Sequence, residues 1–459
     1  MALDIFVVLI YAAGMIALGW YGMRRAKTRD DYLVAGRNLG PGFYLGTMAA
    51  TVLGGASTIG TVRLGYVHGI SGFWLCGAIG LGIVGLSLFL AKPLLKLKIY
   101  TVTQVLERRY NPAARHASAL IMLVYALMIG ATSTIAIGTV MQVLFGLPFW
   151  VSILIGGGVV VLYSTIGGMW SLTLTDIVQF LIMTVGLVFL LMPHAGGWDA
   201  LVAKLPASYF DFTAIGWDTI VTYFLIYFFG IFIGQDIWQR VFTARSETVA
   251  KVAGSAAGIY CVLYGMAGAL IGMAAKVLLP DLENVNNAFA SVVEHSLPNG
   301  IRGLVIAAAL AALMSTASAG LLAASTTVTQ DLLPRLRRGR GQSDNGDVHE
   351  NRIATLLLGL VVLGIALVVS DVISALTVAY NLLVGGMLIP LIGAIYWKRA
   401  TTAGAITSMT LGFLTVLVFM IKDGLDAITP IYYSLAVGLL SFVLVSLFSR
   451  RPTGVASAA

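Results

Sequence analysis

Residues 42–66 read GFYLGTMAATVLGGASTIGTVRLGY. This run is long enough to cross a bilayer, since a transmembrane helix needs about 20 mostly apolar residues. Gly54 and Gly55 interrupt it near the middle and weaken the helix there. Inside a membrane, a break is tolerated only where the freed backbone groups are buried in protein or line a cavity. The stretch therefore predicts a membrane helix that is broken beside an internal site.

The composition extends this reading to the whole chain. Hydrophobic residues make up 59% and charged residues only 10%, whereas a soluble domain carries about 25% charged residues. We therefore expect an all-α integral membrane protein embedded in the lipid bilayer. About thirteen transmembrane spans are predicted, at residues 3–22, 42–66, 71–92, 117–144, 148–166, 174–193, 217–235, 250–279, 300–330, 353–370, 373–396, 402–421 and 429–449.

The distribution of basic residues predicts the orientation. The net charge is +8, but the basic residues are spread between apolar runs, which argues against a nucleic-acid partner. If the N-terminus is outside and the C-terminus cytoplasmic, all but five of the 28 lysines and arginines fall on the cytoplasmic side. The five exceptions are Arg63, Lys204, Lys276, Arg302 and Lys422. The compact chain and short loops favour the cytoplasmic (inner) membrane of a bacterium.

A second interrupted span suggests an internal repeat. The seventh span is broken around Gly230 and Gly234, five spans after the first break. This spacing predicts two five-helix inverted repeats, each opening with a discontinuous helix. Close helix packing is the alternative explanation for either glycine pair alone. The expected organisation is one transmembrane domain over 1–459, with an extra helix at 3–22, repeats at 42–193 and 217–396, and two additional helices at 402–449.

The ninth span carries a candidate cation site. Ala312, Ser315 and Thr316 are three and four residues apart and therefore share one helix face. Their carbonyl and hydroxyl oxygens are ligands that suit sodium, a hard cation. The Ala50 and Leu53 carbonyls, freed by the break in the second span, would complete the set. Alternatively, the two hydroxyls bond back to the preceding turn of their own helix.

Several motifs now resemble a known family. Residues 167–179 read GGMWSLTLTDIVQ. Three further segments agree with the same family in their order along the chain and in their predicted side of the membrane: residues 32–37, Gln239 with Arg240, and residues 396–399. The chain is similar to the sodium:solute symporter family from about residue 3 to residue 450. The resemblance implies a LeuT-like, five-plus-five inverted-repeat fold and secondary active transport by alternating access. It implies import of a small organic solute, with amino acids and carboxylates ranked first, Na⁺ as the coupling ion, no cofactor and no enzyme activity. A monomer is sufficient.

The resemblance also implies residue roles. The sodium ligands are again the Ala50, Leu53 and Ala312 carbonyls with the Ser315 and Thr316 hydroxyls. Some relatives have a second sodium site that would use Asp176 and Ser318, but a further serine ligand is replaced here by Ala319. Asp176 has two other interpretations, as the proton carrier of a proton-coupled symporter and as the N-cap of the sixth span.

The solute is expected beside the break in the second span. The resemblance places Gly54, Ser57 and Thr58 there, and the candidates that face them are Phe229, Gln235 and Asn381. For Phe229, core or lipid packing is an equal alternative.

Arg63 lies eight or nine residues beyond the break, or roughly 12–14 Å along a helix. At that distance, a gate-lining or snorkelling role is favoured over contact with a substrate carboxylate.

Other functional classes find less support. No phosphate-binding loop, nucleotide fingerprint or hydrolytic triad pattern appears in the sequence, which disfavours an ATP-driven pump or an enzyme. A transporter-like solute sensor is the remaining alternative from another class.

Overall fold

The computed structural model describes residues 2–191, 197–333, 344–369, 371–425 and 427–449. Within these residues the chain is helical, with one isolated backbone bridge between Leu39 and Ala244. The predicted all-α class is confirmed. Ten helices are long and apolar enough to cross a membrane, or up to eleven if a bent pair counts as one span.

The helices of the first half have the following bounds. They are α1 (Ala2–Arg25), α2 (Arg29–Val34), α3 (Pro41–Val52), α4 (Thr61–His68), α5 (Trp74–Gly85), α6 (Ala91–Leu97), α7 (Thr103–Arg109), α8 (Pro112–Phe145), α9 (Phe149–Met183) and α11 (Gly197–Lys204), with π-helical turns η2 (Ala56–Gly60), η4 (Leu86–Leu90) and η5 (Thr184–Leu191) and 3₁₀ turns η1 (Ala35–Arg37), η3 (Gly69–Phe73) and η6 (Ala207–Phe210).

The second half continues in the same way. Its helices are α12 (Trp217–Tyr223), α13 (Phe229–Ile231), α14 (Gln235–Val241), α15 (Glu247–Leu278), α16 (Ala288–Ser296), α17 (Ile301–Thr327), α19 (Asp344–Val368), α20 (Val372–Tyr396), α21 (Thr402–Asp423) and α22 (Thr429–Phe448), with π-helical turns η7 (Phe224–Phe228) and η9 (Val328–Leu332) and a 3₁₀ turn η8 (Val285–Asn287).

The count of thirteen spans stays a prediction. α9 contains both the fifth and the sixth predicted spans, and one helical run, Ala56–Leu97, joins the end of the second to the third. The orientation also stays a prediction. Part of the basic segment between the ninth and tenth predicted spans, and Arg450 and Arg451, lie outside the described residues.

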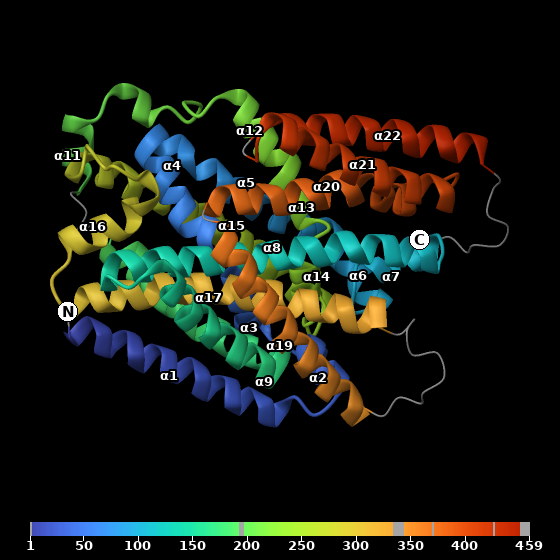
Figure 1. Ribbon diagram of the computed structural model, residues 1–459, viewed down its shortest axis with the longest axis horizontal. Coiled ribbons are helices and arrows are strands. Elements are labelled where there is room, and N and C mark those ends of the chain that lie inside the picture. Colours follow the sequence, from blue (N-terminus) through green and yellow to red (C-terminus); the bar gives the residue numbers. More distant parts are fainter. Residues whose placement is uncertain (1, 192–196, 334–343, 370, 426, 450–459) are drawn as a thin grey trace.

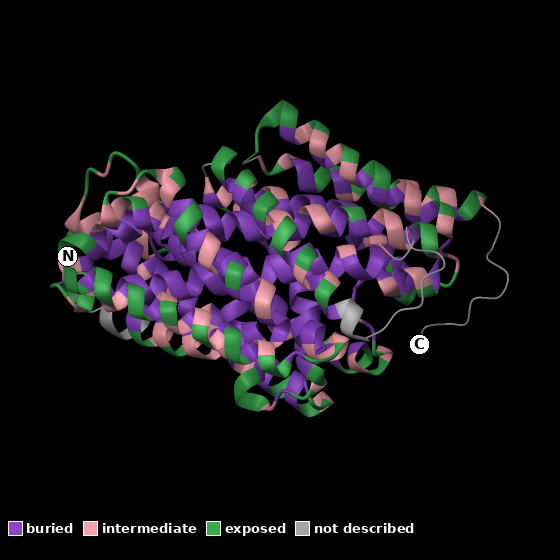
Figure 2. Ribbon diagram, turned by 60° about the horizontal axis from the view of Figure 1, so that its bottom comes forward, coloured by how far each residue is buried: buried purple, intermediate pink, exposed green. Residues whose placement is uncertain are grey.

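Burial falls from the centre of the bundle to its edges (Figure 2). In its most apolar window, α17 is 94% buried and α20 is 83% buried, whereas α1 and α22 reach only 22% and 28%. α1 packs along α9 at one edge, and α21 and α22 pack against α20 at the other (Figure 1). α17 is therefore the central helix, and its neighbours surround any site on its surface.

Both predicted breaks are confirmed. α3 ends at Val52 and the next helical turn starts at Ala56. α13 ends at Ile231 and α14 starts at Gln235, with a bend of 48° between the two helices.

A short backbone strap connects the segments that flank the two broken helices. The Leu39 N–H donates to the Thr243 carbonyl at 2.9 Å, and the Arg245 N–H donates to the Leu39 carbonyl at 3.1 Å. Leu39 comes just before α3, and Thr243 follows α14. The two broken helices are thus held together at one end.

Gly168 marks a kink inside α9. It has φ 54° and ψ −143°, a conformation that is essentially restricted to glycine. A Cβ atom here would lie 2.6 Å from the Tyr32 carbonyl oxygen. The helix continues after the kink, so Asp176 lies well inside α9. The interpretation of Asp176 as a helix N-cap is therefore wrong.

We expect Gly168→Ala to lower the free energy of unfolding by about 1–3 kcal/mol, because a side chain is strained at this backbone conformation and also collides with Tyr32. Gly158→Ala is the matched control in the same helix, since no atom lies within 4 Å of a Cβ at that position. Thermal unfolding in detergent measures both variants. Equal midpoints for the two variants would contradict the assignment.

Candidate functional site

The break after α3 lies against α17. The Ser315 hydroxyl is 2.6 Å from the Ala50 carbonyl oxygen and 2.9 Å from the Ala312 carbonyl oxygen. The Thr316 hydroxyl is 2.6 Å from the Thr51 carbonyl oxygen and 3.5 Å from that of Ala50. The structure thus brings together four of the five predicted sodium ligands and adds the Thr51 carbonyl.

The fifth predicted ligand is engaged differently. The Leu53 carbonyl accepts a hydrogen bond from the Thr58 hydroxyl at 3.3 Å. Gly54 next to it is in close contact with α17, because a Cβ there would lie 2.5 Å from the Thr316 hydroxyl oxygen. The alternative of back-bonding applies in part to Ser315, which reaches Ala312 in its own helix, while Thr316 bonds across to α3.

This oxygen cluster has more acceptors than donors. Two hydroxyl protons face three carbonyl oxygens, and the Ala312 carbonyl also belongs to the unbroken helix α17. The cluster thus gathers five oxygens, three from carbonyls and two from hydroxyls. Hard cations are held in proteins by carbonyl, hydroxyl and carboxylate oxygens.

A narrow pocket with a cavity volume of about 20 Å³ adjoins the cluster. Of the predicted solute contacts, Gly54 and Ser57 line it. Thr316 also lines it, so the oxygen cluster and the pocket share a wall. Both features lie beside the first break.

The other predicted solute contacts point elsewhere. Thr58 faces a neighbouring cavity and bonds the Tyr264 hydroxyl at 3.1 Å. Phe229 packs on the rings of Phe228 and Phe232. The Gln235 amide holds the backbone of Tyr100 and Val102 at 2.8 and 3.0 Å.

Asn381 is fully buried outside the pocket lining, and its Oδ1 has no hydrogen-bond partner among the described residues.

The lining residues that the sequence analysis missed include Ser133, Asp236 and Tyr380. The Ser133 hydroxyl accepts a hydrogen bond from the Gly55 N–H at 3.3 Å. Asp236 accepts one from the Tyr125 hydroxyl at 3.0 Å, and the Tyr125 and Tyr380 rings pack edge to face at 5.3 Å. A carboxylate inside an apolar run was a signal for Asp236, since ionisable groups within a membrane mark functional sites by default.

Asp176 has fixed partners. Its Oδ2 atom accepts a hydrogen bond from the Thr47 hydroxyl and lies 3.6 Å from an Arg240 nitrogen, and both charged side chains are fully buried. Ser318 instead donates to the Ser315 carbonyl at 2.8 Å. Among the described residues, no recorded contact joins Ser318 to Asp176. The guanidinium supplies the positive charge that a second sodium or a proton would bring.

Arg63 belongs to a group that we call the outer latch, formed by Arg63, Asp371 and Asn286. Arg63 and Asn286 reach the Asp371 Oδ2 atom at 3.0 and 3.3 Å. Burial alone would raise the pKa of Asp371, but hydrogen bonds from Ser374 and the Arg63 charge outweigh it and hold the pKa below its usual value. Asp371 is thus charged, and the Arg63 guanidinium already forms an ion pair with this side chain.

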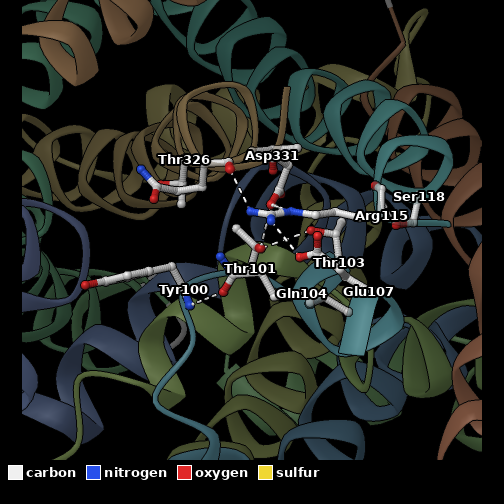
Figure 3. A network of polar contacts seen from close by, with 12 residues as sticks. Tyr100, Thr101, Thr103, Gln104, Glu107, Arg115, Ser118, Thr326 and Asp331 are labelled. Atoms are coloured by element: carbon white, nitrogen blue, oxygen red, sulfur yellow. Dashed lines mark hydrogen bonds and ion pairs between the residues drawn. The ribbon is translucent and has the colours of Figure 1, made fainter. Parts of the chain in front are cut away.

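A second polar cluster, the inner network, lies toward the opposite end of the bundle (Figures 1 and 3). Arg115 donates to Asp331 at 2.8 Å and to Glu107 at 2.6 Å, and Thr101 donates to Asp331 at 3.0 Å. These residues connect α7 and α8 to the π-helical end of α17. The pocket lies between the outer latch and the inner network.

Comparison with known proteins gives consistent matches. A model of the sodium:solute symporter family matches residues 32–412. The osmoregulated proline transporter OpuE of Bacillus subtilis is 27% identical, over 98% of this chain and 96% of its own. The structure of a Na⁺-coupled sialic acid symporter in a substrate-bound outward-open state has a TM-score of 0.83 at 21% identity, covering 98% of this chain and 99% of that chain. MhsT in complex with L-phenylalanine has a TM-score of 0.58 at 14% identity, covering 88% and 97%. The two structures show the LeuT-like fold.

We expect Arg240→Met to lower the free energy of unfolding by about 3–5 kcal/mol, because it leaves the buried Asp176 carboxylate without its charged partner. The double variant Arg240→Met with Asp176→Asn should recover part of the loss. Glu247→Gln, which removes an exposed ion pair with Lys92, is the control and should change little. Additive losses in the double variant would contradict the pairing.

Proposed function

The chain belongs to the sodium:solute symporter family, and from this premise we propose that it couples the entry of one Na⁺ to the import of a small organic solute. As a member of this family it is a sodium-coupled membrane transporter. The observation that carries the proposal is the contact of the Ser315 and Thr316 hydroxyls with the carbonyls freed at the end of α3.

Sodium binds at this oxygen cluster in the proposed mechanism. Its ligands are the Ala50, Thr51 and Ala312 carbonyls and the two hydroxyls, with Leu53 joining if its bond to Thr58 opens. Because Thr316 lines both the cluster and the pocket, sodium fixes the pocket wall in its binding form. The coupling is reciprocal, so each ligand raises the affinity for the other. The membrane potential adds about 2.3 kcal/mol per charge per 100 mV to inward movement.

The solute occupies the pocket beside the first break, which has to widen from its cavity volume of about 20 Å³ to admit it. Amino acids rank first in this proposal and carboxylates second, and the OpuE relative, which is named for proline transport, supports this order. The Ser133 and Tyr380 hydroxyls offer hydrogen bonds around the pocket, and Ser57, which already donates to the Val52 carbonyl at 2.7 Å, can accept one. Proton coupling through Asp176 is the weaker alternative, because Arg240 already compensates that carboxylate.

In the proposed transport cycle, the two ends of the pocket open alternately. The outer latch closes one end and the inner network the other, and each must open in turn. The two repeats at 42–193 and 217–396 move relative to each other. The proposed location is the inner membrane of a bacterium, with the outer latch toward the outside.

Sodium binding is tested by thermal unfolding of the purified protein in NaCl and in matched KCl. The wild type should unfold at a higher midpoint in sodium, and Ser315→Ala should raise the sodium concentration for half-maximal stabilisation by at least about tenfold, or about 1.4 kcal/mol. Ser325→Ala is the matched control, since this buried hydroxyl in α17 bonds back to Leu322. Equal wild-type midpoints in both salts would refute the sodium site.

The outer latch is tested with Asp371→Asn, which keeps the helix-capping oxygen but removes the charge that holds Arg63. Because both side chains are 29% exposed, the ion pair is worth only about 1 kcal/mol, and maleimide should label Ser57→Cys on the order of fivefold faster in this background. The pKa of Asp371 is lowered, so acid should loosen the latch only as the pH falls through that lowered value. Glu247→Gln is the control, and an unchanged rate in Asp371→Asn would mark Arg63 as a snorkelling residue.

A further inference from the structure

Asp236 is the only charged side chain among the described residues that line the pocket. It is only 3% exposed, and it lies at the start of α14, directly after the second break. The Tyr125 hydroxyl holds its Oδ1 atom at 3.0 Å. The hydroxyl donor favours the ionised form of this buried carboxylate.

The charges around Asp236 do not balance within the described residues. Arg240 interacts electrostatically with both Asp176 and Asp236, and its ion pair is with Asp176 at 3.6 Å. Two buried carboxylates therefore share one guanidinium. Burying an uncompensated charge is costly, so this group favours a ligand that brings one positive charge.

The surroundings of Asp236 suit an organic cation. The Tyr380 ring lines the pocket and is held edge to face by Tyr125 and Tyr227, each at 5.3 Å between ring centres. An aromatic face attracts ammonium groups within about 6 Å of the ring centre. Sodium prefers several oxygen ligands, and these are gathered around Thr316, whereas Leu376 and Ile129 are among the apolar residues of the pocket wall.

We propose that Asp236 selects solutes that carry a cationic nitrogen, which lies between its carboxylate and the Tyr380 ring. This inference rests on the proposed function, since the pocket must be the solute site. A carboxylate on the same solute faces Ser133, whose oxygen accepts from the Gly55 N–H and whose proton is left to donate. Monocarboxylates and sugars without such a nitrogen leave Asp236 uncompensated and bind weakly.

Matched pairs of solutes test the proposal in the purified full chain. L-Proline is compared with tetrahydrofuran-2-carboxylate, which has oxygen in place of the ring nitrogen, and choline with 3,3-dimethylbutanol, which lacks the charge. Thermal unfolding is followed in NaCl and in KCl. We expect at least one nitrogen-bearing solute to stabilise the wild type in sodium with at least tenfold higher affinity than its isostere.

In the variant Asp236→Asn, the ratio of affinities between the nitrogen-bearing solute and its isostere should fall by at least tenfold. Sodium alone should still stabilise this variant. Asp218→Asn, at an exposed position in α12, is the control and should behave as the wild type. If Asp236→Asn does not fold, the wild-type comparison of each solute with its isostere still decides the question.

Three outcomes overturn the inference while the sodium response stands. They are equal affinity for both members of each pair, no response to either nitrogen-bearing solute, and loss of stabilisation by sodium alone in Asp236→Asn, which would make Asp236 a sodium ligand. A wild type that does not distinguish NaCl from KCl would instead refute the proposed function, so the two failures are distinct.

Discussion

The structure depends on how the freed backbone at the end of α3 is satisfied. Helix ends leave carbonyls without partners, and lipid offers no hydrogen bonds to replace them. The Ser315 and Thr316 hydroxyls of α17 meet this need at Ala50 and Thr51. The most buried helix of the bundle therefore stabilises the break. The same contact places an oxygen cluster, a pocket and the second broken helix side by side.

α14 extends this principle with charged and amide side chains. All seven of its residues are buried. Gln239 donates to the Leu33 carbonyl and to the Thr326 hydroxyl, and Gln235 holds the segment before α7. Asp236 alone of these polar groups reaches the pocket. A short buried helix thus combines fixed connections with one charge that faces the solute site.

The sequence predicted the class, the two breaks and most of the oxygen cluster, because these follow from composition, glycine position and helical spacing. It did not resolve the number of spans, since Gly168 and the π-helical turns let neighbouring spans run together. Thr51, Ser133 and Tyr380 were missed because nothing in their local sequence marks them, and only the packing of α3, α8 and α20 brings them together. Gln235 was misplaced for the same reason: its side chain accepts a hydrogen bond from the Val102 N–H and does not line the pocket.

The contact between Ser315 and Ala50 joins residues that are 265 positions apart. A ribosome that adds 5–20 residues per second needs roughly 13 to 53 s to make that interval. During synthesis, the first broken segment therefore waits in or near the membrane without the hydroxyls that satisfy it. The insertion machinery has to shelter this segment until α17 emerges. The first broken helix is therefore completed only after about two thirds of the chain has been made.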